Sequence, residues 1–177
     1  MFKWKTRIFG DKRLKLTPEM KAVYKRAAEL VDEYWIQSEL LAGVVTEDAT
    51  YSELDPTYEK PSWQSEEDVY EAGSEIHDFR GWANGKVQVT GVCAVGAIER
   101  AAWEVLGKPF MGEKKNQRRV EGLATRCVER ADAMVDATFS DDEDGRWITS
   151  VIDFNDDSDR NKEDVVEMMK AVGYLDR

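Results

Sequence analysis

Residues 92–106 read VCAVGAIERAAWEVL, and this stretch decides the fold. It is apolar on almost every side, which is typical of a helix in the middle of a core rather than at the surface. Gly107 and Pro109 follow it, and a glycine just past a helix with a proline beyond it marks a helix C-terminus. The stretch therefore predicts a central helix around which the rest of the chain packs.

Further helices are predicted where apolar residues recur three and four positions apart. The first follows Thr17, a residue type that caps helices, and has Pro18 at its first position. The last begins at Asn161, which forms a capping pair with Asp164. With the central helix, these predicted ranges are 17–35, 92–106, 116–138, 147–152 and 161–173.

The sequence predicts a mainly α fold, a single compact domain of five or six helices. Residues 2–8 and 86–89 alternate in polarity and predict a small two-stranded β element. Residues 43–64 show no sustained periodicity and predict a long loop. The expected organisation is a basic arm over 1–16, an acidic insertion over 43–80 with a helix from Ser65 to about Asp78, and a helical core formed by 81–177 with 17–42.

The formal net charge of this 177-residue chain is −11. Because binding to phosphates requires Lys and Arg, this charge argues against direct nucleic-acid binding by the protein as a whole. The arm over 1–16 is basic, however, and two interpretations stay open for it. It docks on the protein's own acidic body, or it meets a partner.

The sequence also indicates where the protein works. No apolar run approaches the roughly 18 residues that a membrane span needs, and residues 1–5 lack the apolar region of a signal peptide. Cys93 and Cys127 have no disulfide or metal-binding spacing, which favours a reducing compartment. We therefore expect a cytoplasmic protein without a membrane contact.

The chain has no phosphate-binding glycine loop and no protease motif, so we expect no cofactor.

Three blocks of sequence, taken in order, resemble the DUF6197 family, uncharacterised proteins of actinobacteria and their phages. The resemblance implies a compact helical fold and such a source, and it implies no catalytic residue. It covers most of the chain apart from the arm and the stretch 43–80. The family tends to place glycine after its Trp-x-Gln, where this chain has Ser38. The blocks are 27–30 with Trp35-Ile36-Gln37, 92–98 with Ala101-Ala102, and Ile148 with Phe154-Asn155-Asp156 and 160–165.

Cys93 is the first candidate for catalysis. A cysteine at a helix N-terminus can ionise more readily, and His77, the only histidine, could serve as its base. Cys93 nevertheless lies in an apolar block, where most cysteines are packed and inert. We favour this second interpretation.

A candidate calcium loop begins at Asp153. Oxygen-bearing side chains follow it at the spacing of an EF-hand, but Ser158 stands where the turn glycine belongs and Asp164 stands where a glutamate belongs. A turn followed by the Asn161 helix cap explains the same residues, and we favour it. The potential metal ligands are Asp153, Asn155, Asp157 and Asp164.

The acid load suggests a binding surface. Carboxylates interleaved with aromatic side chains can mimic a phosphate backbone and dock on a basic groove, although acids also serve simply to solvate a surface. The candidate binding residues are Glu47, Asp48, Glu53, Asp55, Trp63, Glu66, Glu67, Asp68 and Glu71.

The leading hypothesis is a non-enzymatic accessory protein that binds a host or phage protein with a basic surface, in the host cytoplasm if a phage encodes it. One form of this function is inhibition of a nucleic-acid-binding or defence protein. Two alternatives stay open: a small enzyme with a pocket near Cys93 and Asn155/Asp156, and a virion or assembly component.

Overall fold

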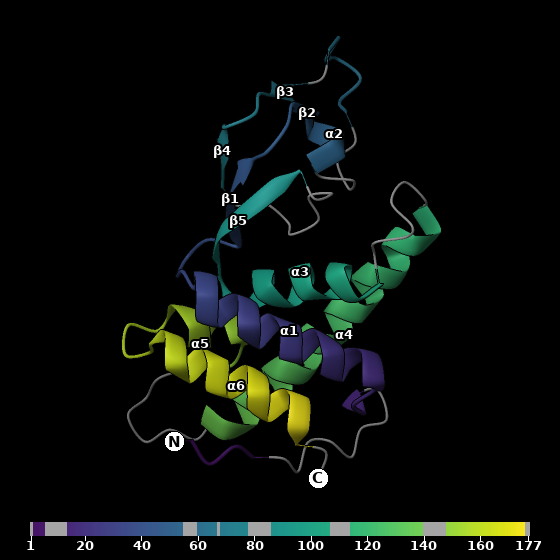
Figure 1. The fold of residues 1–177 in the computed structure, drawn as a ribbon. Coiled ribbons are helices and arrows are strands. Elements are labelled where there is room, and N and C mark those ends of the chain that lie inside the picture. The colour runs from purple at the N-terminus through teal and green to yellow at the C-terminus, as the bar shows by residue number, and fades with distance from the viewer. Residues whose placement is uncertain are drawn as a thin grey trace.

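The computed structural model describes residues 2–5, 14–54, 60–66, 68–77, 86–106, 114–139 and 148–175. The fold is mainly α, as predicted, with a helical body from which a small lobe projects (Figure 1). The body holds α1 (Pro18–Tyr34), α3 (Ala94–Leu106), α4 (Lys114–Phe139), α5 (Val151–Asp156) and α6 (Lys162–Tyr174). The lobe holds β1 (Leu41–Val45), β2 (Ala49–Thr50), α2 (Tyr51–Leu54), β3 (Val69–Tyr70), β4 (Glu75–Ile76) and β5 (Val87–Val92).

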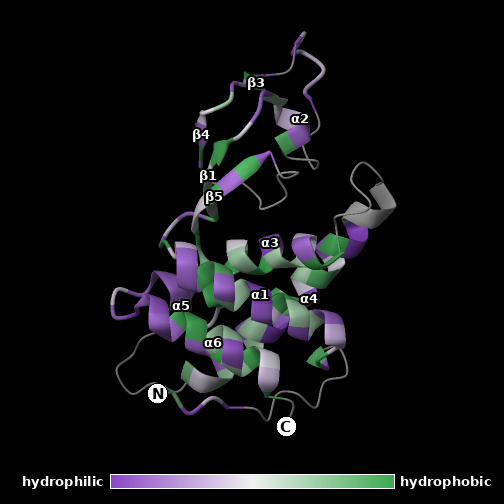
Figure 2. Ribbon diagram, in the orientation of Figure 1, coloured by the Kyte–Doolittle hydropathy of each residue, from purple (hydrophilic) through white to green (hydrophobic). Residues whose placement is uncertain are grey.

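The body packs around α1 and α3, whose apolar faces meet in the core. α1 contacts α3, α4 and α6, and α4 also contacts α3, α5 and α6. The predicted central helix is confirmed, since most residues of the first two turns of α3 are buried. Figure 2 shows that α3 is largely hydrophobic. Both predicted caps are confirmed as well: Thr17 accepts a hydrogen bond from the Met20 amide, and Asn161 and Asp164 form a complete capping box.

Three secondary-structure predictions are wrong, and two of them concern strands and loops. The strand pair 2–8 with 86–89 is wrong, because β5 pairs with β1 and residues 2–5 form no strand; residues 6–8 lie outside the described residues. The loop over 43–64 is wrong, because that range contains β1 in part, β2 and α2. Strand pairing joins segments distant in sequence, so local periodicity could not reveal it.

The predicted acidic helix over 65–78 is also wrong. This segment forms the short strands β3 and β4 with a turn at Gly73, whose φ of +92° suits a glycine and ends any helix. β3 pairs with β2, and β4 and β5 flank β1 in an antiparallel sheet. A capping pattern at Ser65 without apolar residues at helical spacing was therefore insufficient to make a helix.

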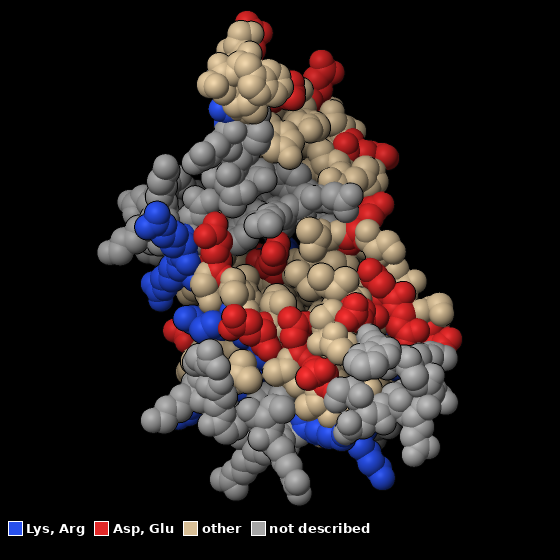
Figure 3. Space-filling view, turned by 180° about the vertical axis from the view of Figure 1, so that it is seen from behind, with Lys and Arg blue, Asp and Glu red and all other residues tan. Residues whose placement is uncertain are grey.

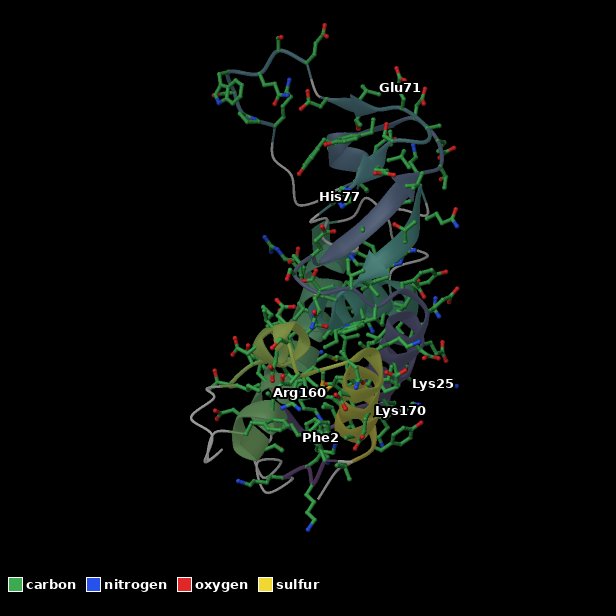
Figure 4. All side chains as sticks on the ribbon, turned by 90° about the vertical axis from the view of Figure 1, so that its left-hand side faces the viewer. Phe2, Lys25, Glu71, His77, Arg160 and Lys170 are labelled. Carbon is green, nitrogen blue, oxygen red and sulfur yellow. The ribbon has the colours of Figure 1, made fainter. Side chains whose placement is uncertain are left out.

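The described part of the N-terminal arm docks on the body. The rings of Phe2 and Trp4 pack edge-on against Phe139 and Phe154, with centroids 5.5–5.9 Å apart. The Arg160 guanidinium lies 5.0 Å from the centre of the Phe2 ring (Figure 4). Residues 2–5 therefore follow the first of the two interpretations, while residues 6–13 lie outside the described part of the chain.

A fully buried arginine closes the far end of the body. Arg130 of α4 donates from Nε to the Val172 carbonyl at 3.2 Å, and from its other nitrogens to the carbonyls of Leu14 and Leu175. The Val172 and Leu175 carbonyls lie at the C-terminal end of α6, where a positive charge is favourable, and the Leu14 carbonyl lies just before α1. Within the described ranges, no helix is both long and apolar enough to cross a membrane.

Candidate functional site: the neck and the acidic lobe

The lobe joins the body through a neck, formed by residues 35–40, 92–96 and 154–157. Asn155, only 1% exposed, lies at its centre. Its Oδ1 accepts hydrogen bonds from Trp35 Nε1 and from the Ala94 amide, both at 3.0 Å. Its Nδ2 donates to the Ile36 carbonyl at 3.4 Å and to Asp156 Oδ1 at 2.7 Å. The amide thus uses its full hydrogen-bonding capacity and caps α3 from a distant part of the chain.

Backbone contacts complete the neck. Gln37 Nε2 donates to the Asn155 carbonyl at 2.9 Å, and the Ser38 amide donates to Asp156 Oδ1 at 3.0 Å. The Leu40 carbonyl accepts from the Cys93 amide at 3.3 Å and lies directly over Gly96. These bonds fix the direction in which the chain leaves α1 for the lobe and returns from β5 to α3.

Cys93 lies beside a cavity of about 120 Å³ in the neck. Its side chain is buried, and its Sγ accepts a hydrogen bond from the Gly96 amide at 3.4 Å. Burial raises the pKa of the Cys93 thiol, and this effect outweighs the stabilisation of the thiolate by the Gly96 and Val95 amides. The cavity is also lined by Ser38, Glu39, Leu40, Ile152, Asn155 and Asp156.

His77 does not line this cavity. It lies in the lobe (Figure 4), with Nδ1 3.1 Å from Glu39 Oε2 and Nε2 4.0 Å from Glu75 Oε2. Its side chain is 56% exposed. The described contacts pair His77 with carboxylates of the lobe, and Cys93 is buried without His77 beside its cavity. This geometry resembles that of a packed cysteine.

Three of the candidate acids hold the lobe together. Lys86 Nζ lies 3.6 Å from Glu47 and 3.1 Å from Glu53, between the two carboxylates. The hydrogen bond from the Thr50 amide and then that from Lys86 lower the pKa of Glu53. Asp48 Oδ1 accepts from the Ala72 amide at 2.9 Å.

At the outer end of the lobe, several exposed side chains form no contact that stabilises the described part of the lobe. Trp63 is 83% exposed and Val69 is 62% exposed. The carboxylates of Glu66, Asp68 and Glu71 are exposed and form no hydrogen bond or ion pair with another residue that the structure describes. Figure 4 places Glu71 at the end of the lobe far from the body, and Figure 3 shows acidic side chains continuing from the lobe onto the body. Asp55 and Glu67 lie outside the described residues.

Local contacts hold this outer end in place. The Gln64 amide donates to the Pro61 carbonyl at 3.0 Å, and Lys60 Nζ donates to the Ser65 carbonyl at 3.1 Å, which closes the turn that presents Trp63. We define the outer end as Trp63, Glu66, Asp68, Val69 and Glu71. It is a surface that combines apolar and negatively charged side chains.

The neck brings together parts of all three sequence blocks: the Trp35-Ile36-Gln37 segment, the start of α3, and Phe154-Asn155-Asp156. The family model of DUF6197, described as a family of unknown function, matches residues 16–173. The chain belongs to the DUF6197 family. Searches of the curated proteins and of the solved structures found no match. The resemblance in the sequence is thus confirmed, and many of the residues that carried it lie in the neck.

The four candidate metal ligands each have a separate structural partner. Asp153 Oδ2 accepts from the Thr149 amide at 3.2 Å, and Asp157 Oδ1 accepts from the Asp159 amide at 3.1 Å. Asn155 accepts the hydrogen bond from the Ala94 amide in the neck, and Asp164 belongs to the capping box of α6. Among the described residues, no three potential ligands of this kind come together around one point.

Sequence reasoning missed Arg130 and the partners of Asn155. Arg130 falls between Cys127 and Met134 in the apolar stripe of α4, and a charged residue at such a position signals a buried polar contact. Trp35 and Gln37 were visible only as parts of a block. Nothing local indicated that both would bond Asn155, some 120 residues away.

Replacing Ser38 by glycine is expected to raise the free energy of unfolding by about 0.5 kcal/mol. Ser38 has a φ of +66°, a left-handed conformation that costs a side-chain-bearing residue about 1 kcal/mol. Part of this gain is lost because glycine makes the unfolded chain more flexible. Urea unfolding measures the change. Ser62→Gly, at an exposed site without positive φ, is the control and should destabilise; equal effects of the two variants would contradict the strain at Ser38.

Both cysteines are expected to react with a thiol reagent at least about a hundredfold more slowly in the folded protein than in urea at pH 8. Burial raises the pKa of Cys127 to about 12 and also raises that of Cys93, so the thiolate fraction of each falls. Cys93 should react before Cys127 because it adjoins the cavity. Mass spectrometry after timed alkylation gives both rates. Labelling of folded Cys93 as fast as a small free thiol would instead support a nucleophile.

Proposed function

We propose that this DUF6197 member acts by binding a partner protein with a basic surface, through the outer end of its lobe, and not by catalysis. The observation that carries this proposal is the 83% exposure of Trp63 in a lobe whose outer carboxylates lack described partners. The turn holds this aromatic side chain in solvent, and tryptophan is among the residues that most often anchor interfaces.

Charge supports the same surface. Glu66, Asp68 and Glu71 face solvent, whereas Glu47 and Glu53 are already compensated by Lys86. Uncompensated carboxylates attract a basic partner over a distance and select it against acidic ones. The neck and the short strands hold these groups in place, which reduces the entropy lost on binding.

The finer proposal concerns the partner. The resemblance to proteins of actinobacteria and their phages favours a host or phage protein, met in the host cytoplasm. One form of the function is occupation of the phosphate-binding groove of a nucleic-acid-binding or defence protein by the carboxylates. In that form, an excess of duplex DNA should release the partner, because both would compete for one groove.

Affinity purification with matched variants tests the binding surface. Trp63→Ala, and separately Glu66→Gln/Asp68→Asn/Glu71→Gln, are expected to weaken retention of a partner by about tenfold or more, since interface anchors contribute at least about 1.4 kcal/mol. The charge-matched control is Glu33→Gln/Asp136→Asn/Glu163→Gln, on exposed sites of the body, and it should retain the partner.

Two outcomes of this affinity purification would contradict the proposed binding surface. A partner that the lobe variants retain and the body variant loses would place the interface on the body. Retention that falls equally with the lobe charge variant and with the charge-matched body variant would reflect net charge alone. Either result would remove the outer end of the lobe as the binding surface.

A further inference from the structure

A second surface, on the helical body, has the opposite character. α1 and α6 enclose a groove of about 380 Å³, lined among others by Lys21 and Lys25 of α1 and by Met169, Lys170, Gly173 and Tyr174 of α6. Lys25 and Lys170 lie on the same side of the helix pair (Figure 4). None of the candidate binding residues that the structure describes lines this groove, so it is separate from the outer end.

The floor of the groove is apolar. Met169 and Tyr24 are almost completely buried beneath it, and Gly173 adds no side chain. A Cβ at Gly173 would lie 2.9 Å from Tyr24 Cβ, so glycine both allows the close approach of the helices and leaves space above them. Tyr174 is 72% exposed at the edge of the groove, where its ring can cover an apolar side chain.

The rim is positively charged. The side chains of Lys21, Lys25 and Lys170 are exposed, and none of their ammonium groups forms an ion pair or hydrogen bond with a residue that the structure describes. Like charges four residues apart on one helix, as Lys21 and Lys25 are, repel each other. Three uncompensated lysines around one groove, on a chain with a net charge of −11, are explained most simply by an anionic ligand.

Glu29 also lines the groove but does not cancel this charge. Its carboxylate accepts a hydrogen bond from Arg26 at 3.2 Å, and Arg26 also pairs with Glu104. The groove therefore keeps a positive rim over an apolar floor.

We propose that this groove binds an acidic peptide segment of a partner protein, with one apolar side chain on the floor and carboxylates at the three lysines. A simple anion such as phosphate would leave the apolar floor unused. A nucleic acid carries a charge on every phosphate and would extend beyond the three lysines over a protein of net charge −11, whereas a short acidic segment can keep its few carboxylates at the groove. The proposal goes beyond the function of the lobe, because it uses another face and a partner of opposite charge.

Fluorescence anisotropy with the full chain tests the proposal. The probe is a fluorescein-labelled peptide of alternating Glu and Asp around one central Leu. The groove variant is Lys25→Glu/Lys170→Glu, and the control with the same change in formal charge is Lys3→Glu/Arg118→Glu, at exposed sites elsewhere. Circular dichroism checks that both variants fold.

The unmodified chain is expected to bind the probe at low salt. Its affinity should fall about tenfold or more in the groove variant, stay within about twofold in the control, and fall when the central Leu of the probe is replaced by Gly. Absence of binding, an equal loss in both variants, or full displacement by inorganic phosphate at a concentration equal to the probe would overturn the proposal. A dimer of the unmodified chain that the groove variant loses would also overturn it, by showing that a second copy occupies the groove.

Discussion

Replacing Gly96 by alanine is expected to lower the free energy of unfolding by about 3 kcal/mol. A Cβ at Gly96 would lie 1.7 Å from the Leu40 carbonyl oxygen and 2.7 Å from its carbon, and both are backbone atoms. The clash can be relieved only if residues 38–41 move away from α3, which breaks the hydrogen bond from the Cys93 amide to Leu40. Urea or thermal unfolding followed by circular dichroism measures the loss.

Gly122→Ala is the matched control for this prediction. Gly122 also lies inside a helix, α4, but a Cβ there meets nothing within 4 Å. Alanine has a higher helix propensity, so this variant should be more stable by about 0.5–1 kcal/mol. If Gly96→Ala were stabilising like Gly122→Ala, the close packing of the neck on α3 would be wrong.

Replacing Asn155 by alanine is expected to cost about 3 kcal/mol. The side chain is buried, and its loss leaves Trp35 Nε1, the Ala94 amide and the Ile36 carbonyl without their partner. Each buried polar group left unsatisfied costs about 1–3 kcal/mol, and partial relaxation reduces the sum. Chemical unfolding gives the total, and hydrogen exchange should show faster exchange at the Ala94 amide.

Asn161→Ala provides the comparison for Asn155. Asn161 is an exposed helix cap, and its removal should cost only about 1 kcal/mol. Equal costs at the two sites would mean that Asn155 acts as an ordinary local cap and that the neck does not depend on it.

The sequence predicted the features of the fold that depend on residues close together in the chain. The Thr17 cap, the Asn161–Asp164 capping box and the apolar pattern of α3 depend on residues within a few positions of one another, and all three were confirmed. The acidic stretch over 65–78 was wrong because a capping pattern alone does not decide between helix and strand. The turn at Gly73 and the pairing of Thr50 with Val69 decide it.

Long-range contacts account for what the sequence did not show. The Asn155 amide meets Trp35 and Ala94 only after folding, so the blocks that carried the family resemblance gave no sign of their common place in the neck. The lysine groove has the same origin, since Lys21 and Lys25 share a helix while Lys170 comes from α6. The exposure of Trp63 agrees with its place among acids in the sequence, whereas Trp103, which lies in an apolar block, is buried.

Photo-crosslinking in the natural host tests the binding role of the lobe most directly. The photoreactive residue p-benzoylphenylalanine would replace Trp63 in the tagged chain, with the same substitution at Glu33 on the body as the control. The account predicts one prominent crosslinked protein with a basic surface at position 63, lost when Glu66→Gln/Asp68→Asn/Glu71→Gln are added. No crosslink at position 63, or the same products from both positions, would contradict it.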